Sequence, residues 1–225
     1  MALFVLTLGG NMSDPVALAI SVLALSVSAT TAWLTLFRRG TVLMTQPTVI
    51  FFGPDVSRSR GRAPLPKVFF RTLIFSTSKR GRIIESMHVA VHRNETHQTF
   101  NIWVHGDEKL VRGSGLFVGE NGVAANHHFL TPEDGGHFRF SAGRYRLEVF
   151  ARILGDRHHK LLFTQELEIT SQIAASLETP RAGLYFDWGA DSATYIPHVE
   201  TREPSDPDAL QALLTQFATG RDSKL

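Results

Sequence analysis

The first long apolar segment of the chain predicts one helix that crosses a membrane. Residues 16–37 form 22 consecutive positions without a charged residue, a proline or a glycine. At about 1.5 Å per residue, such a helix is about 33 Å long, which matches a hydrocarbon core of about 30 Å. A helix of this length in a water-soluble domain would normally carry a charged face. We therefore expect a transmembrane helix at 16–37, preceded by a short N-terminal segment at 1–15.

Both ends of this segment carry residues typical of a membrane span. Asp14 and Pro15 can cap and begin the helix. Trp33 lies about one turn before Arg38 and Arg39, and aromatic and basic residues mark the membrane interface. Two other interpretations stay open, a buried helix and a cleaved signal peptide, although nothing basic precedes the apolar run. The sequence also leaves open whether Met1 or Met12 is the natural start.

The distribution of basic residues predicts the orientation of the span. No Lys or Arg precedes it, whereas ten follow between positions 38 and 82, where Asp55 is the one acid. The positive-inside rule then places the N-terminus outside and the large C-terminal part in the cytoplasm. Such basic residues also attract the anionic lipids of the inner leaflet. The opposite orientation, with the domain in the periplasm, stays open.

Small residues recur along one stripe of the predicted helix. Small side chains let helices approach closely in lipid, and hydroxyl groups can bond across the contact. The stripe predicts a helix–helix contact, with a second copy or with another protein. Chance in a segment rich in Ala, Ser and Thr is the alternative. The residues are Ala17, Ser21, Ala24, Ser28, Thr31 and Thr35.

After a linker at 38–47, the pattern changes to a period of two residues. The apolar runs are short, rich in Val, Ile, Phe and Thr, and separated by turn residues such as Asn94-Glu95 and Gly155-Asp156. In 144–153, for example, the odd positions are apolar and most even positions are charged. This pattern predicts a mainly β, antiparallel sandwich domain over 48–170. The expected strands are 48–52, 67–76, 82–93, 98–105, 110–111, 116–118, 123–130, 138–140, 144–154 and 160–170.

Residues 140–149, FSAGRYRLEV, resemble the penultimate strand of immunoglobulin-like and fibronectin-like sandwiches. In those domains a Gly precedes a Tyr whose hydroxyl bonds back to the backbone, a role that the resemblance gives to Tyr145. Residues 160–170 would be the last strand. The resemblance implies a fold and no function. More loosely, residues 45–54, which follow the span, are similar to bacterial single-span membrane proteins of unassigned function.

Two polar regions depart from this pattern, one inside the domain and one after it. The loop at 56–66 carries three arginines and no acid, and we expect it to be solvated and to face the membrane. The last 55 residues, 171–225, carry eight acids and four bases. Within them, 183–199 holds four aromatic residues and either packs on the sandwich or binds a partner. Residues 206–219 predict a short helix, which docks on the domain or on another protein.

The search for catalytic chemistry gives little. The chain has no cysteine, which excludes disulfides, thiolate zinc sites and a cysteine nucleophile. Its net charge is only +2, and no phosphate loop or nucleophile elbow is present, so we expect no nucleic-acid partner and no cofactor. Ten histidines leave one alternative. A metal site could form if strand-end histidines such as His105, His127 and His128 converged from different strands.

These patterns predict a non-enzymatic binding or scaffolding module at a bacterial inner membrane. Its expected partners are the lipid bilayer and a protein, or a second copy through the span. A membrane-tethered enzyme or metal-binding protein is the first alternative. An envelope assembly or stress component that faces the periplasm is the second.

Overall fold

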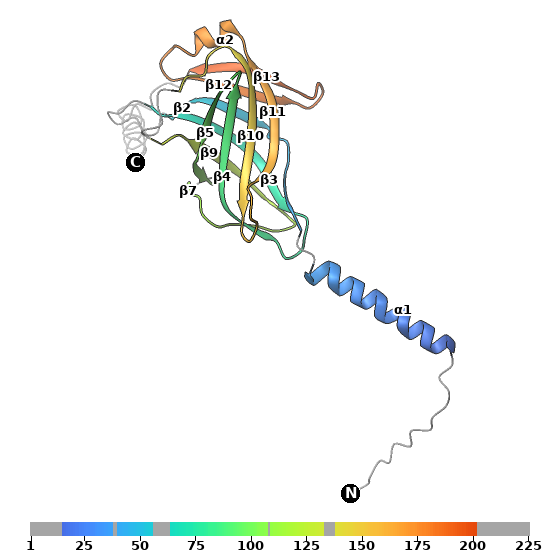
Figure 1. Ribbon diagram of the computed structural model, residues 1–225. Coiled ribbons are helices and arrows are strands. Elements are labelled where there is room, and N and C mark those ends of the chain that lie inside the picture. Colours follow the sequence, from blue (N-terminus) through green and yellow to red (C-terminus); the bar gives the residue numbers. More distant parts are fainter. Residues whose placement is uncertain (1–14, 38–39, 56–63, 108, 133–137, 202–225) are drawn as a thin grey trace, which may run out of the picture.

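The computed structural model describes residues 15–37, 40–55, 64–107, 109–132 and 138–201 (Figure 1). This described part of the chain is mainly β, with 54% of its residues in strands, and it forms two antiparallel sheets and one N-terminal apolar helix. The expected fold class is confirmed at this level. The acidic segment beyond Thr201, with its predicted helix at 206–219, lies outside the described residues.

The N-terminal helix has the length and composition of a membrane span. Helix α1 covers Pro15–Ala32, and a π-helical turn, η1, continues it over Trp33–Phe37. No part of Pro15–Thr35 is buried inside the protein, which argues against a core helix of a folded domain. A signal sequence near the N-terminus would share these properties, so the helix is confirmed and its place in a membrane is not.

The larger sheet, sheet A, has eight strands in the order β13-β12-β2-β3-β9-β6-β7, with β1 paired to β3. All its pairs are antiparallel. Its strands are β1 (Val42–Met44), β2 (Val49–Pro54), β3 (Pro66–Ser76), β6 (Ile102–His105), β7 (Val111–Arg112), β9 (Val123–Leu130), β12 (Ala182–Gly189) and β13 (Thr194–Thr201).

The smaller sheet, sheet B, has five strands in the order β11-β10-β4-β5, with β8 paired to β4. Strands β10 and β4 are long and twist across the other sheet (Figure 1). The strands are β4 (Arg82–Arg93), β5 (Thr96–Phe100), β8 (Leu116–Val118), β10 (Gly143–Ile153) and β11 (Lys160–Ile169).

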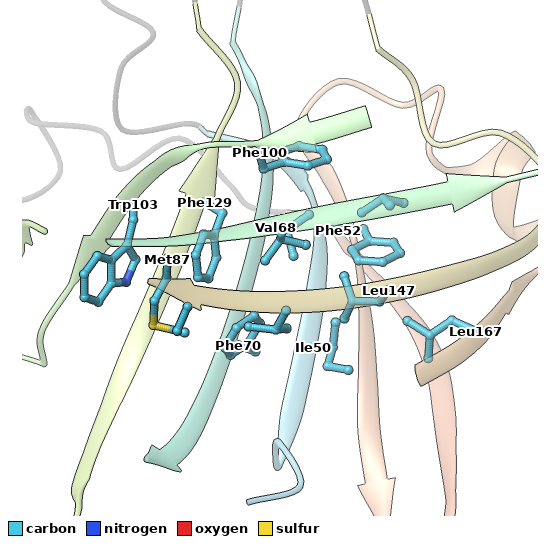
Figure 2. Packing of buried hydrophobic residues seen from close by; sticks show 14 of the residues in the cluster. Ile50, Phe52, Val68, Phe70, Met87, Phe100, Trp103, Phe129, Leu147 and Leu167 are labelled. Atoms are coloured by element: carbon cyan, nitrogen blue, oxygen red, sulfur yellow. The ribbon is translucent and has the colours of Figure 1, made fainter. Parts of the chain in front are cut away.

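The core lies between the two sheets and is built from the alternate, inward-facing positions of their strands. Sheet A contributes Ile50, Phe70 and Phe129, and sheet B contributes Met87 and Leu147, all at most 1% exposed. Figure 2 shows these side chains packed together between the strands. Burial of each large apolar side chain contributes about 1.5–3 kcal/mol, and this core is the main source of stability of the two-sheet domain.

The run at 98–105, which the pattern predicts as one strand, is two strands in different sheets. β5 pairs with β4 in sheet B. The strand is interrupted at Asn101, and β6, which follows, pairs with β9 in sheet A. The alternation shifts by one residue at the break, because Phe100 and Trp103, three positions apart, both enter the core. A local pattern records burial and cannot record which sheet supplies the hydrogen bonds.

The strand predicted at 138–140 is wrong. Phe138 and Phe140 lie in irregular backbone, and their rings close one side of the core instead. Phe140 stacks on Phe52 at 4.7 Å between ring centroids, and Phe138 meets Phe100 edge to face at 5.8 Å. The two aromatic side chains therefore alternate as they would in a strand, although this segment forms no strand and pairs with none.

The tyrosine contact expected from residues 140–149 is present. The Tyr145 hydroxyl donates a hydrogen bond to the Ser141 carbonyl at 2.7 Å, and the side chain is 1% exposed. Burial raises the pKa of this phenol, so it stays a neutral donor. The contact fixes the corner at which the chain enters β10.

Sheet A continues beyond the boundary expected at 170. A short helix, α2 (Ser171–Ser176), with Thr170 as its N-cap, leads from β11 into the hairpin β12–β13. β12 pairs with β2, opposing Phe186 to Ile50 and Leu184 to Phe52. Of the two alternatives for residues 183–199, packing on the domain is what the structure shows.

Candidate interaction surface

The outer face of sheet B carries three side-chain ion pairs and a cluster of histidine rings. It is formed by the positions of β4, β10 and β11 that alternate with the core positions. The inward positions of β10 are buried, whereas Arg144, Arg146 and Arg152 are exposed. This face has three parts, a His–Glu–Arg cluster, a central apolar strip and a second ion pair.

The His–Glu–Arg cluster is centred on Glu148 of β10. Its carboxylate oxygens lie 3.0 Å from His92 Nε2 and 3.2 Å from Arg146 Nε. The His92 ring stacks on the His97 ring of β5, with centroids 5.8 Å apart. The Glu148 side chain is 19% exposed and the His92 side chain is 30% exposed, so both are partly accessible on this face.

The central strip contains Phe150, His88 and Leu161. In the strand register Phe150 opposes His88 on one side and Leu161 on the other. The Phe150 and His88 rings stack at 5.0 Å with an angle of 11°, and His159 meets His88 edge to face at 5.0 Å. Partial burial, and then the charge of His159, lower the pKa of His88, which favours its neutral form in this apolar strip.

The second ion pair completes the rim of the strip. Arg152 Nε of β10 donates to the Glu85 carboxylate of β4 at 2.9 Å. An aromatic and aliphatic centre with charged groups around it is the usual composition of a protein–protein interface. Exposed ion pairs of this kind add little to stability.

The three strand-end histidines do not share one face. His127 points into the core and is fully buried, whereas His128 lies on the outer face of sheet A, where its ring is 4.7 Å from that of Phe69. His105 opposes His127 in the register, and their ring centroids are 6.2 Å apart. Within the described part of the chain, no three His, Asp or Glu residues are placed to hold a metal ion.

The buried His127 is held by a neighbouring indole. Trp103 Nε1 donates a hydrogen bond to His127 Nδ1 at 3.1 Å, which assigns the proton of the neutral ring to Nε2. Desolvation by burial, followed by the charges of His105 and His128, lowers the pKa of His127 to about 3. The group therefore acts as an uncharged part of the core.

A row of aromatic rings crosses the outer face of sheet A. Tyr185 of β12 lies 4.9 Å from Phe51 of β2 and stacks on His198 of β13 at 5.3 Å. The Phe51 ring lies against Gly183 and Gly53, where a Cβ atom would come within 2.2 and 2.5 Å of it. The Phe51 ring fits here only because neither glycine has a side chain, and the sequence pattern had given these two glycines no such role.

The predicted membrane-interface residues are only partly described. Trp33 is 63% exposed and stacks on Phe37 at 5.8 Å, as an interfacial aromatic pair can. Arg38 and Arg39 lie outside the described residues. So do residues 56–63 of the basic loop, which rejoins the described chain before β3.

The small-residue stripe runs along α1 into η1, and three of its hydroxyls bond within the helix. Ser21, Thr31 and Thr35 each donate to the carbonyl four residues earlier at 2.8 Å. Ala17, Ala24 and Ser28 occupy the same stripe, as their spacing requires. The hydroxyl oxygens can still accept a bond from another helix, so the contact stays a prediction.

The chain was compared with protein-family models, with curated proteins and with solved structures, and none of the three comparisons found a match.

Proposed function

We propose that this protein is a single-span membrane protein that displays a two-sheet β-domain as a non-enzymatic binding or scaffolding module. Two observations together support the proposal: the apolar helix has no buried part, and a folded domain starts directly after it at Gly40. Such a helix needs an apolar surrounding, and a bilayer supplies it.

The orientation proposed is N-terminus outside, with the domain on the cytoplasmic side of a bacterial inner membrane. It is supported by the absence of Lys and Arg before the span and by the ten that follow it up to Arg82. A reporter that is active only in the cytoplasm, fused to the C-terminus of the full chain, should be active. Activity of a reporter that works only in the periplasm would overturn this orientation.

We also propose an immunoglobulin-like topology for the two-sheet domain. The Tyr145–Ser141 hydrogen bond, at the start of a long strand next to the last strand of sheet B, supports it. An experimental structure of the full chain tests this part, because the order of the strands in each sheet decides the topology.

The binding surface proposed is the outer face of sheet B. Its central strip of Phe150, His88 and Leu161 offers aromatic and aliphatic contact, and Glu148 and Arg152 offer charges on either side. This combination fits a protein partner better than a small molecule, since it is spread over three neighbouring strands, β4, β10 and β11.

Site-specific photo-cross-linking in intact cells tests this surface. A photoreactive side chain replaces Leu161, which is 45% exposed at the strip, and in a matched control replaces Ile196, which is 55% exposed on β13. We expect a discrete cross-linked product from position 161 and none of the same size from position 196. Equal products from both positions, or none from 161, would contradict a partner on sheet B.

A further inference from the structure

The two-sheet domain begins within three residues of the end of the apolar helix. Phe37 ends η1, and Gly40 is already buried against the domain, where a Cβ atom would lie 2.5 Å from Ser78 Cβ. Consecutive Cα atoms are about 3.8 Å apart, so the Cα atoms of Phe37 and Gly40 are separated by at most about 11 Å. Whatever lies around Gly40 therefore stays beside the end of the helix.

Hydrogen bonds fix this entry point to two turns. Thr41 N donates to Thr77 Oγ1 at 2.8 Å, and Thr77 N donates back to the Thr41 carbonyl at 2.9 Å. Arg82 donates to the Gly40 carbonyl at 3.2 Å and to the Asp156 carboxylate at 2.6 Å. The turns at 77–81 and 154–159 are thus held beside the start of the domain.

A third turn, at 119–122, joins the other two. Ser76 N donates to the Gly119 carbonyl at 2.9 Å, and Phe117 opposes Ile83 in the β4–β8 register. The Phe117 ring lies against Gly81, where a Cβ atom would be 2.5 Å away. We call residues 40–43, 77–83, 117–122 and 154–160 together the helix-side end of the domain, which Figure 1 shows next to α1.

Exposed apolar side chains gather at this end. Outside α1 and η1, the structure describes eight large hydrophobic residues as exposed, and four of them belong to the helix-side end. Phe117 is 58% exposed and Leu154 is 52% exposed, each next to a turn. The other two are Leu43 and Ile83.

Positive charge gathers at the same end. Lys79, Arg80 and Arg157 are exposed in the turns. Of the two acids of the helix-side end, Asp156 is bonded to Arg82 and Glu120 is exposed. An excess of exposed cations next to exposed apolar tips is the composition that contacts anionic lipid headgroups, since the cations meet phosphates and the tips enter the interface.

We propose that the helix-side end of the domain is a lipid-contact surface, which binds the anionic headgroups of the bilayer that α1 crosses. Its Lys79, Arg80 and Arg157 face the headgroup phosphates, and Phe117 and Leu154 enter the interface. The inference rests on the proposed membrane span and adds that the domain lies on the bilayer instead of moving freely on its tether. A surface of this kind fixes the direction in which the outer face of sheet B is presented.

Single-cysteine labelling of the full chain tests the proposal, because the natural chain has no cysteine. A polarity-sensitive fluorophore is attached to L154C or F117C, and the protein is reconstituted in nanodiscs of phosphatidylcholine alone or mixed with phosphatidylglycerol. Some samples carry a nitroxide quencher on the lipid headgroup, and separate samples carry it on the acyl chain, where it reaches a label near the centre of the span. E95C, in the exposed turn at the opposite end of β4, serves as the distant control, and L25C reports on the span.

We expect the labels at 154 and 117 to be quenched in anionic nanodiscs and the label at 95 to be unaffected. The quenching should weaken at high salt, because ions screen headgroup charges beyond a few ångströms. It should also be lost in the triple variant K79E/R80E/R157E and retained in a matched triple variant, R139E/R144E/R181E, at the opposite end. The salt titration of the unsubstituted protein keeps the test valid if the first triple variant does not fold.

Four results would overturn the inference in distinguishable ways. Quenching at 25 but not at 154 or 117 means that the span is in the bilayer and the domain end does not contact it. Quenching that is equal in neutral and anionic lipid means that the headgroup charge is not recognised. Labels that are shielded from a water-soluble quencher only in native membranes mean that a protein covers this end. If the acyl-chain nitroxide does not quench the label at 25, the membrane span is removed, and the proposed function falls with it.

Discussion

The buried imidazole of His127 predicts that acid destabilises the two-sheet domain. The ring is 0% exposed, accepts a hydrogen bond from Trp103 and has its pKa lowered from 6.5 to about 3. Between these two values the unfolded chain binds a proton at this position and the folded chain does not. The stabilisation is therefore complete above about pH 6.5 and is lost as the pH falls toward 3.

The size of the effect follows from the two pKa values. One pH unit below the unfolded pKa corresponds to about 1.4 kcal/mol of differential proton binding. At pH 4.5, about two units below 6.5, the free energy of unfolding should be lower by about 3 kcal/mol. This is a large part of the roughly 5–15 kcal/mol by which a domain is usually stable.

Urea unfolding of the full chain in detergent micelles measures this, followed by tryptophan fluorescence at pH 7.5 and pH 4.5. The variant His127→Gln keeps an acceptor for the Trp103 N–H and removes the titrating group. Other groups titrate in both proteins, so the difference between their two pH-dependent losses isolates His127. If the variant loses as much stability on acidification as the natural protein does, the reasoning about the buried ring is refuted.

Three further substitutions test the core, the sheet surface and the span. Phe129→Ala should lower the free energy of unfolding by about 3–5 kcal/mol in the same urea assay, because the ring is fully buried between the sheets; a loss below about 1 kcal/mol would contradict that placement. Gly183→Ala should cost about 1–3 kcal/mol, since the new Cβ would lie 2.2 Å from the Phe51 ring, and an unchanged unfolding midpoint would count against this contact. Ala24→Leu with Ser28→Leu should weaken self-association measured by energy transfer between labelled chains in vesicles, because bulky side chains keep helices apart, and an unchanged association would remove the predicted contact.

Sequence patterns predicted the elements whose burial alternates locally. The odd positions of 144–153 were expected to be apolar and inward, and Tyr145, Leu147 and Val149 are buried. A bond from the Tyr145 hydroxyl to the backbone was implied by the resemblance to immunoglobulin-like strands, and the structure shows that the Ser141 carbonyl accepts it. The alternation of 144–153 can be predicted from local spacing because a strand with one buried face has a period of two residues.

Long-range pairing is what the sequence did not show. The hairpin β12–β13 has strand-like alternation, with Leu184 and Phe186 inward, yet it completes sheet A by pairing with β2, about 130 residues earlier. The contact between His88 and His159 depends in the same way on the β4–β10–β11 register. Neither spacing nor composition fixes which distant strands become neighbours.

Two features of the structure depend on the path of the backbone and could not be predicted from individual residues. The interruption at Asn101 moves the chain from one sheet to the other and shifts the alternation by one residue, so that Phe100 and Trp103 both face the core. The helix-side end of the domain is assembled from three turns far apart in the sequence, fixed through Arg82 and Ser76. Each turn taken alone is only a short polar segment.

Membrane fractionation of the full-length chain tests the central claim most directly. Cells are broken and centrifuged, the pellet is washed with high salt and alkaline carbonate, and the intact mass of the protein is measured. The account predicts that the protein, with residues 15–37 still attached, stays in the pellet and is released only by detergent. Recovery of the full-length chain in the aqueous fraction without detergent, or of a mature chain that lacks this helix, would contradict it.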